Sequence, residues 1–103
     1  MANQQYIQRL EQAIRHLHNC DSAHLETVPV HETFEGKTVW QGDVEVFVIL
    51  GHRRATKCYA WAAKNPHGGE QFTAVLGTAP VRSATAAVRV SIVTRANEHG
   101  YGV

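Results

Sequence analysis

Residues 44–50 have the sequence VEVFVIL, which is the strongest β-strand signal in the chain. The run combines β-branched, aromatic and apolar residues, the composition that strands favour. Because successive side chains of a strand point to opposite faces, Phe47 shares a face with Glu45 and Ile49, whereas the valines share the other. We expect this strand to lie inside a sheet.

The sequence on both sides of this run predicts further strands joined by short turns. Three stretches have a similar composition and are bounded by turn residues: residues 30–34, 56–63 and 71–77. The cluster NPHGG at 65–69 predicts a tight turn, and Gly42 predicts a bulge or turn before the central strand. Such short connections favour hairpins, and hairpins make an antiparallel sheet.

Two segments have helical features. The apolar residues of Gln4–His18 recur with a period near 3.6, which predicts an amphipathic helix that Asn3 is placed to cap. Residues 83–97 are ambiguous, because Ser83 and the alanines after it favour a helix, whereas VRVSI at 88–92 alternates like a strand. We favour the helix and keep the strand as the alternative.

Together these elements predict a single α+β domain over residues 1–103. The expected order is α-β-β-β(-β)-α, with an antiparallel sheet and both helices on one face, which makes two layers. Residues 19–29 are expected to form a polar linker after the first helix. Residues 98–103 are expected to form a flexible tail.

Two helices on one face would leave the other face of the sheet bare. We expect the rings of Phe47, Tyr59 and Trp61 on that open side, with Trp40 as a further candidate. A large exposed apolar face needs a partner, and we predict a homodimer that forms through it. The alternatives are a stacking platform for nucleotide bases, and a face closed by the linker and the first short strand.

The charge of the chain is nearly balanced, with 10 lysines and arginines against 9 aspartates and glutamates. A nucleic-acid partner would therefore need a local basic patch. The concentrated basic residues are His52, Arg53, Arg54 and Lys57, in and beside the connection between two strands. Phosphate contact by this loop is the alternative function, and a solvated hairpin loop is the plainer interpretation.

The sequence contains no phosphate-binding loop, dinucleotide fingerprint or metalloprotease helix, so we predict neither a cofactor nor a catalytic residue. The densest group of metal-ligand residues is His16, His18, Cys20, Asp21 and His24. Two of its histidines would point about 200° apart on an ideal helix, and we predict no metal site. A small enzyme that uses His67, Glu70 or Cys20 is a further alternative.

Features that direct a protein to another compartment are absent from the sequence. Cys20 and Cys58 are too few for a disulfide scaffold, and we expect both thiols to be reduced. The first residues lack the layout of a signal peptide, and the apolar run at 46–50 is far shorter than the ~20 residues of a membrane span. We expect a cytoplasmic protein without membrane contact.

The order of the predicted elements resembles that of a double-stranded-RNA-binding domain, over roughly residues 44–97. Gly51 and His52 lie where that family has a loop with glycine and histidine, and Ser83 lies where its second helix begins. The resemblance implies RNA binding through lysines at the start of that helix. Residues 84–87 are ATAA, so this lysine motif is absent.

Residues 39–47, VWQGDVEVF, together with Gly51-His52 and CYAW at 58–61, also resemble a small uncharacterised bacterial protein family. That resemblance implies a bacterial origin and no particular activity. We therefore predict a non-enzymatic accessory protein that acts by binding.

Overall fold

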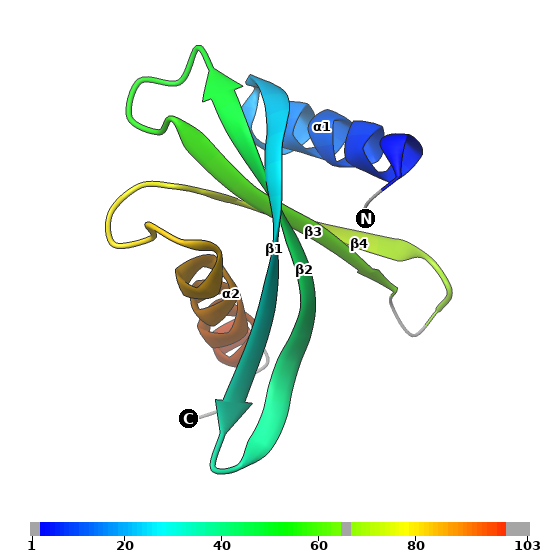
Figure 1. Cartoon of the computed structure of the whole chain (residues 1–103), viewed down its shortest axis with the longest axis vertical. Coiled ribbons are helices and arrows are strands. Elements are labelled where there is room, and N and C mark those ends of the chain that lie inside the picture. The colour runs from blue at the N-terminus through cyan, green and yellow to red at the C-terminus, as the bar shows by residue number, and fades with distance from the viewer. Residues whose placement is uncertain (1–2, 65–66, 99–103) are drawn as a thin grey trace.

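The computed structural model of the protein describes residues 3–64 and 67–98. Its elements in chain order are α1 (Gln4–His18), β1 (Asp21–Phe34), β2 (Lys37–Leu50), β3 (Lys57–Lys64), β4 (Glu70–Leu76) and α2 (Ala84–Glu98). Over the described residues the strands form a four-stranded antiparallel sheet in the order β1-β2-β3-β4 (Figure 1). This confirms the α+β class and the order of elements. Of the tail expected at 98–103, Glu98 belongs to α2 instead, and residues 99–103 lie outside the described residues.

Helix α1 has the bounds that its periodicity predicts. The N–H of Tyr6 donates to the side-chain oxygen of Asn3 at 2.7 Å, so Asn3 caps the first turn as expected. At the other end, Asn19 adopts a left-handed conformation, and its N–H donates to the Arg15 carbonyl at 2.8 Å. Local hydrogen bonds therefore fix both ends of the helix.

Helix α2 confirms the favoured interpretation of its segment and overturns the strand alternative. The N–H of Ala86 donates to Ser83 Oγ at 3.1 Å, so Ser83 is the predicted N-cap. Each β-branched residue costs a helix at most about 0.7 kcal/mol. Burial of Ala87 and Val88 against the sheet offsets that cost.

The prediction of a polar linker at residues 19–29 is wrong, because most of this segment belongs to strand β1. This strand runs from Asp21 to Phe34 and pairs with β2 along its length, so it also contains the short strand expected at 30–34. As the edge strand of an antiparallel sheet, β1 has solvent along one side and carries a polar sequence without regular alternation. Backbone hydrogen bonds to β2 compensate for the apolar contacts that it lacks.

Gly42 lies inside the continuous strand β2, and not at a bulge or turn before it. It pairs with Val30 of β1. A Cβ at position 42 would lie 3.2 Å from Cη2 of Trp40, so the missing side chain gives the indole ring its place on the strand.

The two helices pack on opposite faces of the sheet, which corrects the expected two-layer arrangement. Phe47 and Cys58 lie in the core under α1. Val46, Tyr59 and Trp61 lie in the core under α2. In Figure 1, α1 lies to the right of the β1–β2 hairpin and α2 to its left, so the layers are helix, sheet and helix.

The reason for this arrangement is the two-sided burial of the central strands. Residues 44–47 of β2 and 58–61 of β3 are all buried, whichever face they point to. A strand that is apolar on both faces needs cover on both, and each helix supplies one cover. The near-continuous apolar run at 44–50 is the sequence signal of such a strand.

The bare aromatic face expected from the sequence is absent from the described residues. The exposed fractions are 0% for Phe47, 5% for Tyr59 and 4% for Trp61. Phe47 pairs with Cys58 and faces α1, whereas the other two rings face α2 beside the half-buried Trp40. These rings form the core, so self-association through them loses its structural basis.

Leu10 and Leu17 lie on the same helix but differ in burial, with exposed fractions of 0% and 52%. We expect Leu10→Ala to lower the free energy of unfolding by about 2–5 kcal/mol, because it leaves a cavity under α1. Leu17→Ala, the matched control, should change it by less than about 0.5 kcal/mol. Urea denaturation measures both values, and equal losses would contradict this packing of α1.

Candidate functional site

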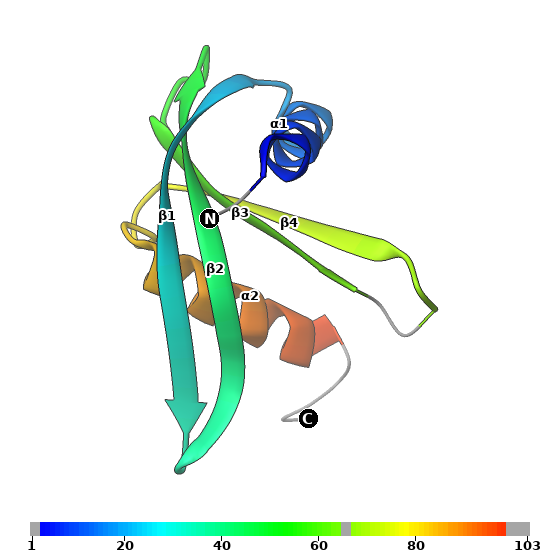
Figure 2. The same ribbon diagram turned by 45° about the vertical axis from the view of Figure 1, so that its right-hand side comes forward.

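Strands β2 and β3 separate partway along the sheet. Within the described residues, their ladder covers only Lys57 to Ala60 of β3. Both strands continue past this point, and Figure 2 shows β2 and the β3–β4 pair running apart. We call the opening between residues 41–45 of β2 and residues 60–63 of β3 the fork. It contains a pocket of about 320 Å³.

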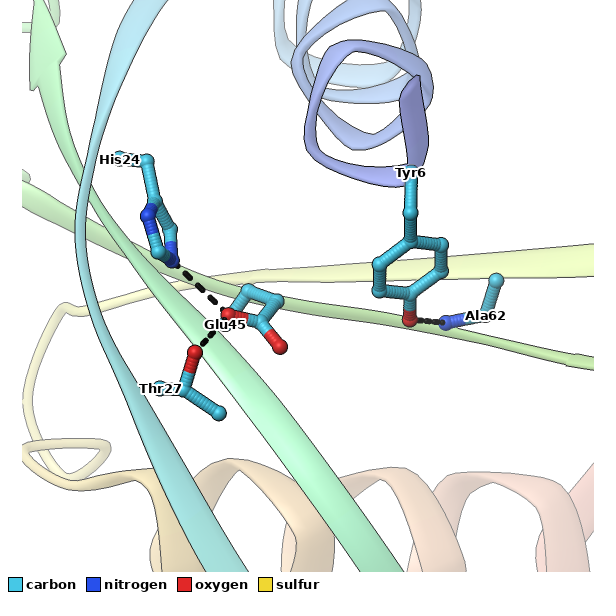
Figure 3. A network of polar contacts seen from close by, with 5 residues as sticks. All are labelled: Tyr6, His24, Thr27, Glu45 and Ala62. Atoms are coloured by element: carbon cyan, nitrogen blue, oxygen red, sulfur yellow. Dashed lines mark hydrogen bonds and ion pairs between the residues drawn. The ribbon is translucent and has the colours of Figure 1, made fainter. Parts of the chain in front are cut away.

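Tyr6 of α1 takes the place of a strand partner at the fork. The next hydrogen-bonded pair of the ladder would join Ala62 to Asp43, but the N–H of Ala62 donates to the Tyr6 hydroxyl at 2.9 Å (Figure 3). Burial raises the pKa of this hydroxyl more than the Ala62 hydrogen bond lowers it, and the Glu45 carboxylate adds to the rise. The hydroxyl therefore stays protonated at neutral pH and keeps its own O–H to donate.

The opposite side of the fork is an unpaired length of backbone. The N–H of Ile49 donates to the Thr56 carbonyl at 3.0 Å, so the odd-numbered residues here direct their backbone groups away from β1. The N–H and C=O of Gln41 and Asp43 therefore face the fork. Pro29 of β1 lies opposite Asp43 and lacks an N–H, and no ladder bond is lost because Asp43 faces away from it.

A buried carboxylate lies at the point where the ladder ends. Glu45 is 1% exposed, and its Oε1 accepts a hydrogen bond from Thr27 Oγ1 at 2.5 Å. The same oxygen lies 2.8 Å from His24 Nε2, which donates when that nitrogen carries the hydrogen. These two donors compensate for the burial of the charge. Figure 3 shows the second oxygen, Oε2, turned away from both donors and toward the side of Tyr6.

A β-bulge in β1 brings both donors to Glu45. His24 and Thr27 are three residues apart, so regular alternation would place them on opposite faces of the sheet. The register shifts between His24 and Glu26, which leaves Leu25 as an extra residue. The extra residue turns His24 and Thr27 to the same face, the face of Glu45.

Two tryptophans line the same pocket from the other face of the sheet. The ring centroids of Trp40 and Trp61 lie 5.5 Å apart, with 70° between the ring planes. Edge-to-face contact of this kind fixes both rings. Glu45 and Tyr6 belong to the α1 side, so the fork has an acidic side and an aromatic side.

The charges that line the fork are negative. Glu45 and Asp43 contribute carboxylates, and none of the described lining residues is a lysine or arginine. The nearby Arg9 guanidinium lies 5.8 Å from the centroid of the Tyr6 ring, and it is ion-paired with Glu70 at 3.3 Å. The pocket therefore favours a positively charged group.

The predicted basic loop lies far from the fork, at the top of Figure 1. His52 has a structural role, because its Nδ1 accepts hydrogen bonds from the N–H of Arg54 at 3.1 Å and of Ala55 at 2.9 Å. Arg53, Arg54 and Lys57 are exposed. No ion pair with a carboxylate is found for these three cations among the described residues.

The histidine and cysteine candidates are dispersed. His18 Nε2 lies 2.8 Å from the Ala74 carbonyl, Asp21 pairs with Arg15, and His24 contacts Glu45. Among the described residues, no group of three or more histidine, cysteine, aspartate or glutamate side chains is arranged to hold a metal ion.

The cysteines are both free and buried, so they form no disulfide. The Cys20 thiol donates to the His18 carbonyl at 3.2 Å. Burial raises the pKa of Cys58 to about 12, so this thiol is un-ionised at neutral pH, as expected of a core residue.

Sequence reasoning named Trp40 and Trp61 as candidates for a partner face but missed the polar residues of the fork. It grouped His24 with possible metal ligands while predicting no metal site, and it placed Thr27 in a linker and Tyr6 on a helix face. One signal was available: Glu45 is the single charged residue in the run VEVFVIL. A charge inside a strand that is apolar on both faces must find hydrogen-bond donors, and so marks a polar network.

Comparisons with family models, curated proteins and solved structures give no match. Among the described residues, no helix is long and apolar enough to cross a membrane.

The Cys58 thiol makes the fold sensitive to alkaline pH. Its pKa is about 12 in the folded chain and 9.0 ordinarily, so above pH 9 the thiol ionises more readily in the unfolded chain. We expect this group to lower the free energy of unfolding by up to about 1.4 kcal/mol per pH unit between the two values. Urea denaturation from pH 8 upward measures the slope. Cys58→Ala should lose less stability over this range than the parent chain. Equal slopes of the free energy of unfolding against pH for the two chains would contradict the assignment of this effect to Cys58.

Proposed function

We propose that the chain is a small binding domain that holds the positively charged group of a ligand in the fork. The observation that carries this proposal is the Glu45 carboxylate, which is buried with its Oε1 occupied and its Oε2 turned away from both donors. An ammonium or guanidinium group donates strong, charge-assisted hydrogen bonds to such an oxygen.

The rest of the pocket supports a cation attached to an apolar body. The Tyr6 hydroxyl oxygen has a second lone pair that can accept a hydrogen bond from the cation, and the exposed Asp43 adds negative charge at the rim. Trp40 and Trp61 supply aromatic surface on the other side, which binds apolar groups and attracts cations. A volume of about 320 Å³ is within the range of small-ligand sites.

A binding role agrees with the expectation from sequence of a non-enzymatic protein, although the ligand face is a different one. The proposed face is the fork, which Trp40 and Trp61 line, whereas Phe47 and Tyr59 are not among its lining residues. The enzyme alternative has little support, because Glu70 is ion-paired with Arg9 and the Cys20 thiol is buried.

Nucleic-acid binding is a second candidate function. It is favoured by one observation, the exposure of Arg53, Arg54 and Lys57 in one short segment without acidic partners among the described residues. Three cations of this kind suit phosphate contact without sequence readout.

The main proposal predicts that the fork distinguishes a cation from its neutral isostere. N-acetyl-arginine amide should change the fluorescence of Trp40 and Trp61 saturably at millimolar concentration, whereas N-acetyl-citrulline amide should not. We expect Glu45→Gln to weaken binding about tenfold or more, because it removes the charge and keeps the shape of the side chain. Equal binding of the two compounds, or no saturable change up to about 10 mM, would contradict the proposal.

The matched control is Glu26→Gln, on the same sheet but at an exposed position of β1. This variant should bind the arginine compound like the parent chain. Tyr6→Phe is a second site variant that leaves Glu45 in place, and it should weaken binding severalfold. It keeps the proposal testable if Glu45→Gln fails to fold. Urea denaturation reports whether each variant is folded.

The second candidate predicts retention of the protein on a mixed-sequence RNA column at low salt. Arg53→Glu should abolish retention, because it reverses a phosphate-contacting charge. Lys37→Glu, at the exposed tip of the β1–β2 hairpin, makes the same change of net charge and should leave retention intact. A parent chain that passes through the column unretained would end this candidate.

A further inference from the structure

We infer that the ligand of the fork is an extended segment of another polypeptide, which pairs as a strand with the free edge of β2 and places an arginine or lysine side chain on Glu45. The inference rests on the proposed function, because the basic side chain is the cation that the fork holds. It adds that the main chain of the ligand is recognised as well.

The backbone of the fork offers one available edge. On β3, the N–H of Ala62 is already bonded to the Tyr6 hydroxyl. On β2, the N–H and C=O of Gln41 and Asp43 face the opening and have no strand partner in the described chain. Unpaired strand edges are templates for another extended chain.

The two sides of the fork match the alternation of an added strand. Successive side chains of a strand point to opposite faces of the sheet. A residue that points to the α1 side meets Glu45 and Tyr6, and its neighbours point toward Trp40 and Trp61. A segment in which a basic residue lies between apolar ones therefore satisfies both sides at once.

The surface beside the fork leaves room for the flanks of such a segment. A second hollow of about 210 Å³ shares Gln41, Gly42 and Asp43 with the fork and continues over Pro29 and His31 of β1. Figures 1 and 2 show α1 beside the other end of the hairpin, away from this region. The negative charge of Glu45 and Asp43 selects a basic segment over an acidic one.

The test compares the affinity of a peptide that contains arginine with the affinity of arginine alone. The probe is acetyl-Thr-Val-Arg-Val-Thr-amide, and its small counterpart is N-acetyl-arginine amide. A third compound is the same peptide with N-methyl groups on the arginine and on both valines, which removes the backbone donors that could pair with β2 in either strand direction and keeps every side chain. Tryptophan fluorescence gives the affinities, and amide hydrogen exchange reports protection of the Gln41 and Asp43 N–H groups.

We expect the peptide to bind about tenfold or more tightly than the arginine compound, and the N-methylated peptide to lose this gain. Gln41→Pro should also abolish the gain, because it removes a fork-facing N–H without breaking a β1–β2 bond. Gln41→Ala, the matched control, keeps the N–H and should keep the gain. Protection of the Gln41 and Asp43 amides on binding supports the inference even if Gln41→Pro fails to fold.

Equal affinity of the peptide and the arginine compound would overturn the strand pairing and leave the proposed function intact. Binding of neither compound would instead overturn the proposed function. If the parent chain is dimeric without peptide and the peptide dissociates it, the fork belongs to a second copy, and the inference of a separate partner is wrong.

Discussion

The hydrogen bonds that Thr27 and His24 make to the Glu45 carboxylate are the interaction on which this structure depends. A charge with 1% exposure is tolerated inside a sheet only if donors surround it. Both donors come from the polar edge strand β1, and the bulge at Leu25 is what turns them to one face. The same contacts that satisfy Glu45 therefore fasten β1 to β2, so the edge strand is held by polar contacts as well as by its ladder.

Strands β2 and β3 separate just beyond the Glu45–Ala60 pair, on the N-terminal side of Glu45, and this separation gives the molecule its distinctive surface. Strands that separate leave backbone groups without partners, and buried ones must be satisfied. The chain solves this on one side with the Tyr6 hydroxyl and leaves the other side open. The opening therefore has polar groups on the face of the sheet that α1 covers and tryptophans on the face that α2 covers. A surface with both kinds of group suits recognition of a ligand that is itself two-sided.

Sequence reasoning succeeded where a local interaction decides the structure. The bounds of α1 follow from its period and from Asn3, and the start of α2 follows from Ser83. It failed for residues 21–29, because an edge strand needs no alternation, and for Thr27 and His24, because their common direction depends on a bulge. Glu45 stood out in the sequence, but its partners lie 18 and 21 residues away. The cations of the basic loop are adjacent in the sequence itself, whereas the role of His52 as an acceptor for its own loop was not visible.

The sequence by itself determined the helices, the strand character of the central run and the antiparallel order of the sheet, because caps, periodicity and turns act between near neighbours. Only the tertiary structure decided which face each helix covers, where the β2–β3 ladder ends and which side chains meet at the fork. These features depend on the register between strands, in which a shift of one residue moves every side chain to the other face. Register is set by the packing of the whole core, and no short stretch of the chain contains it.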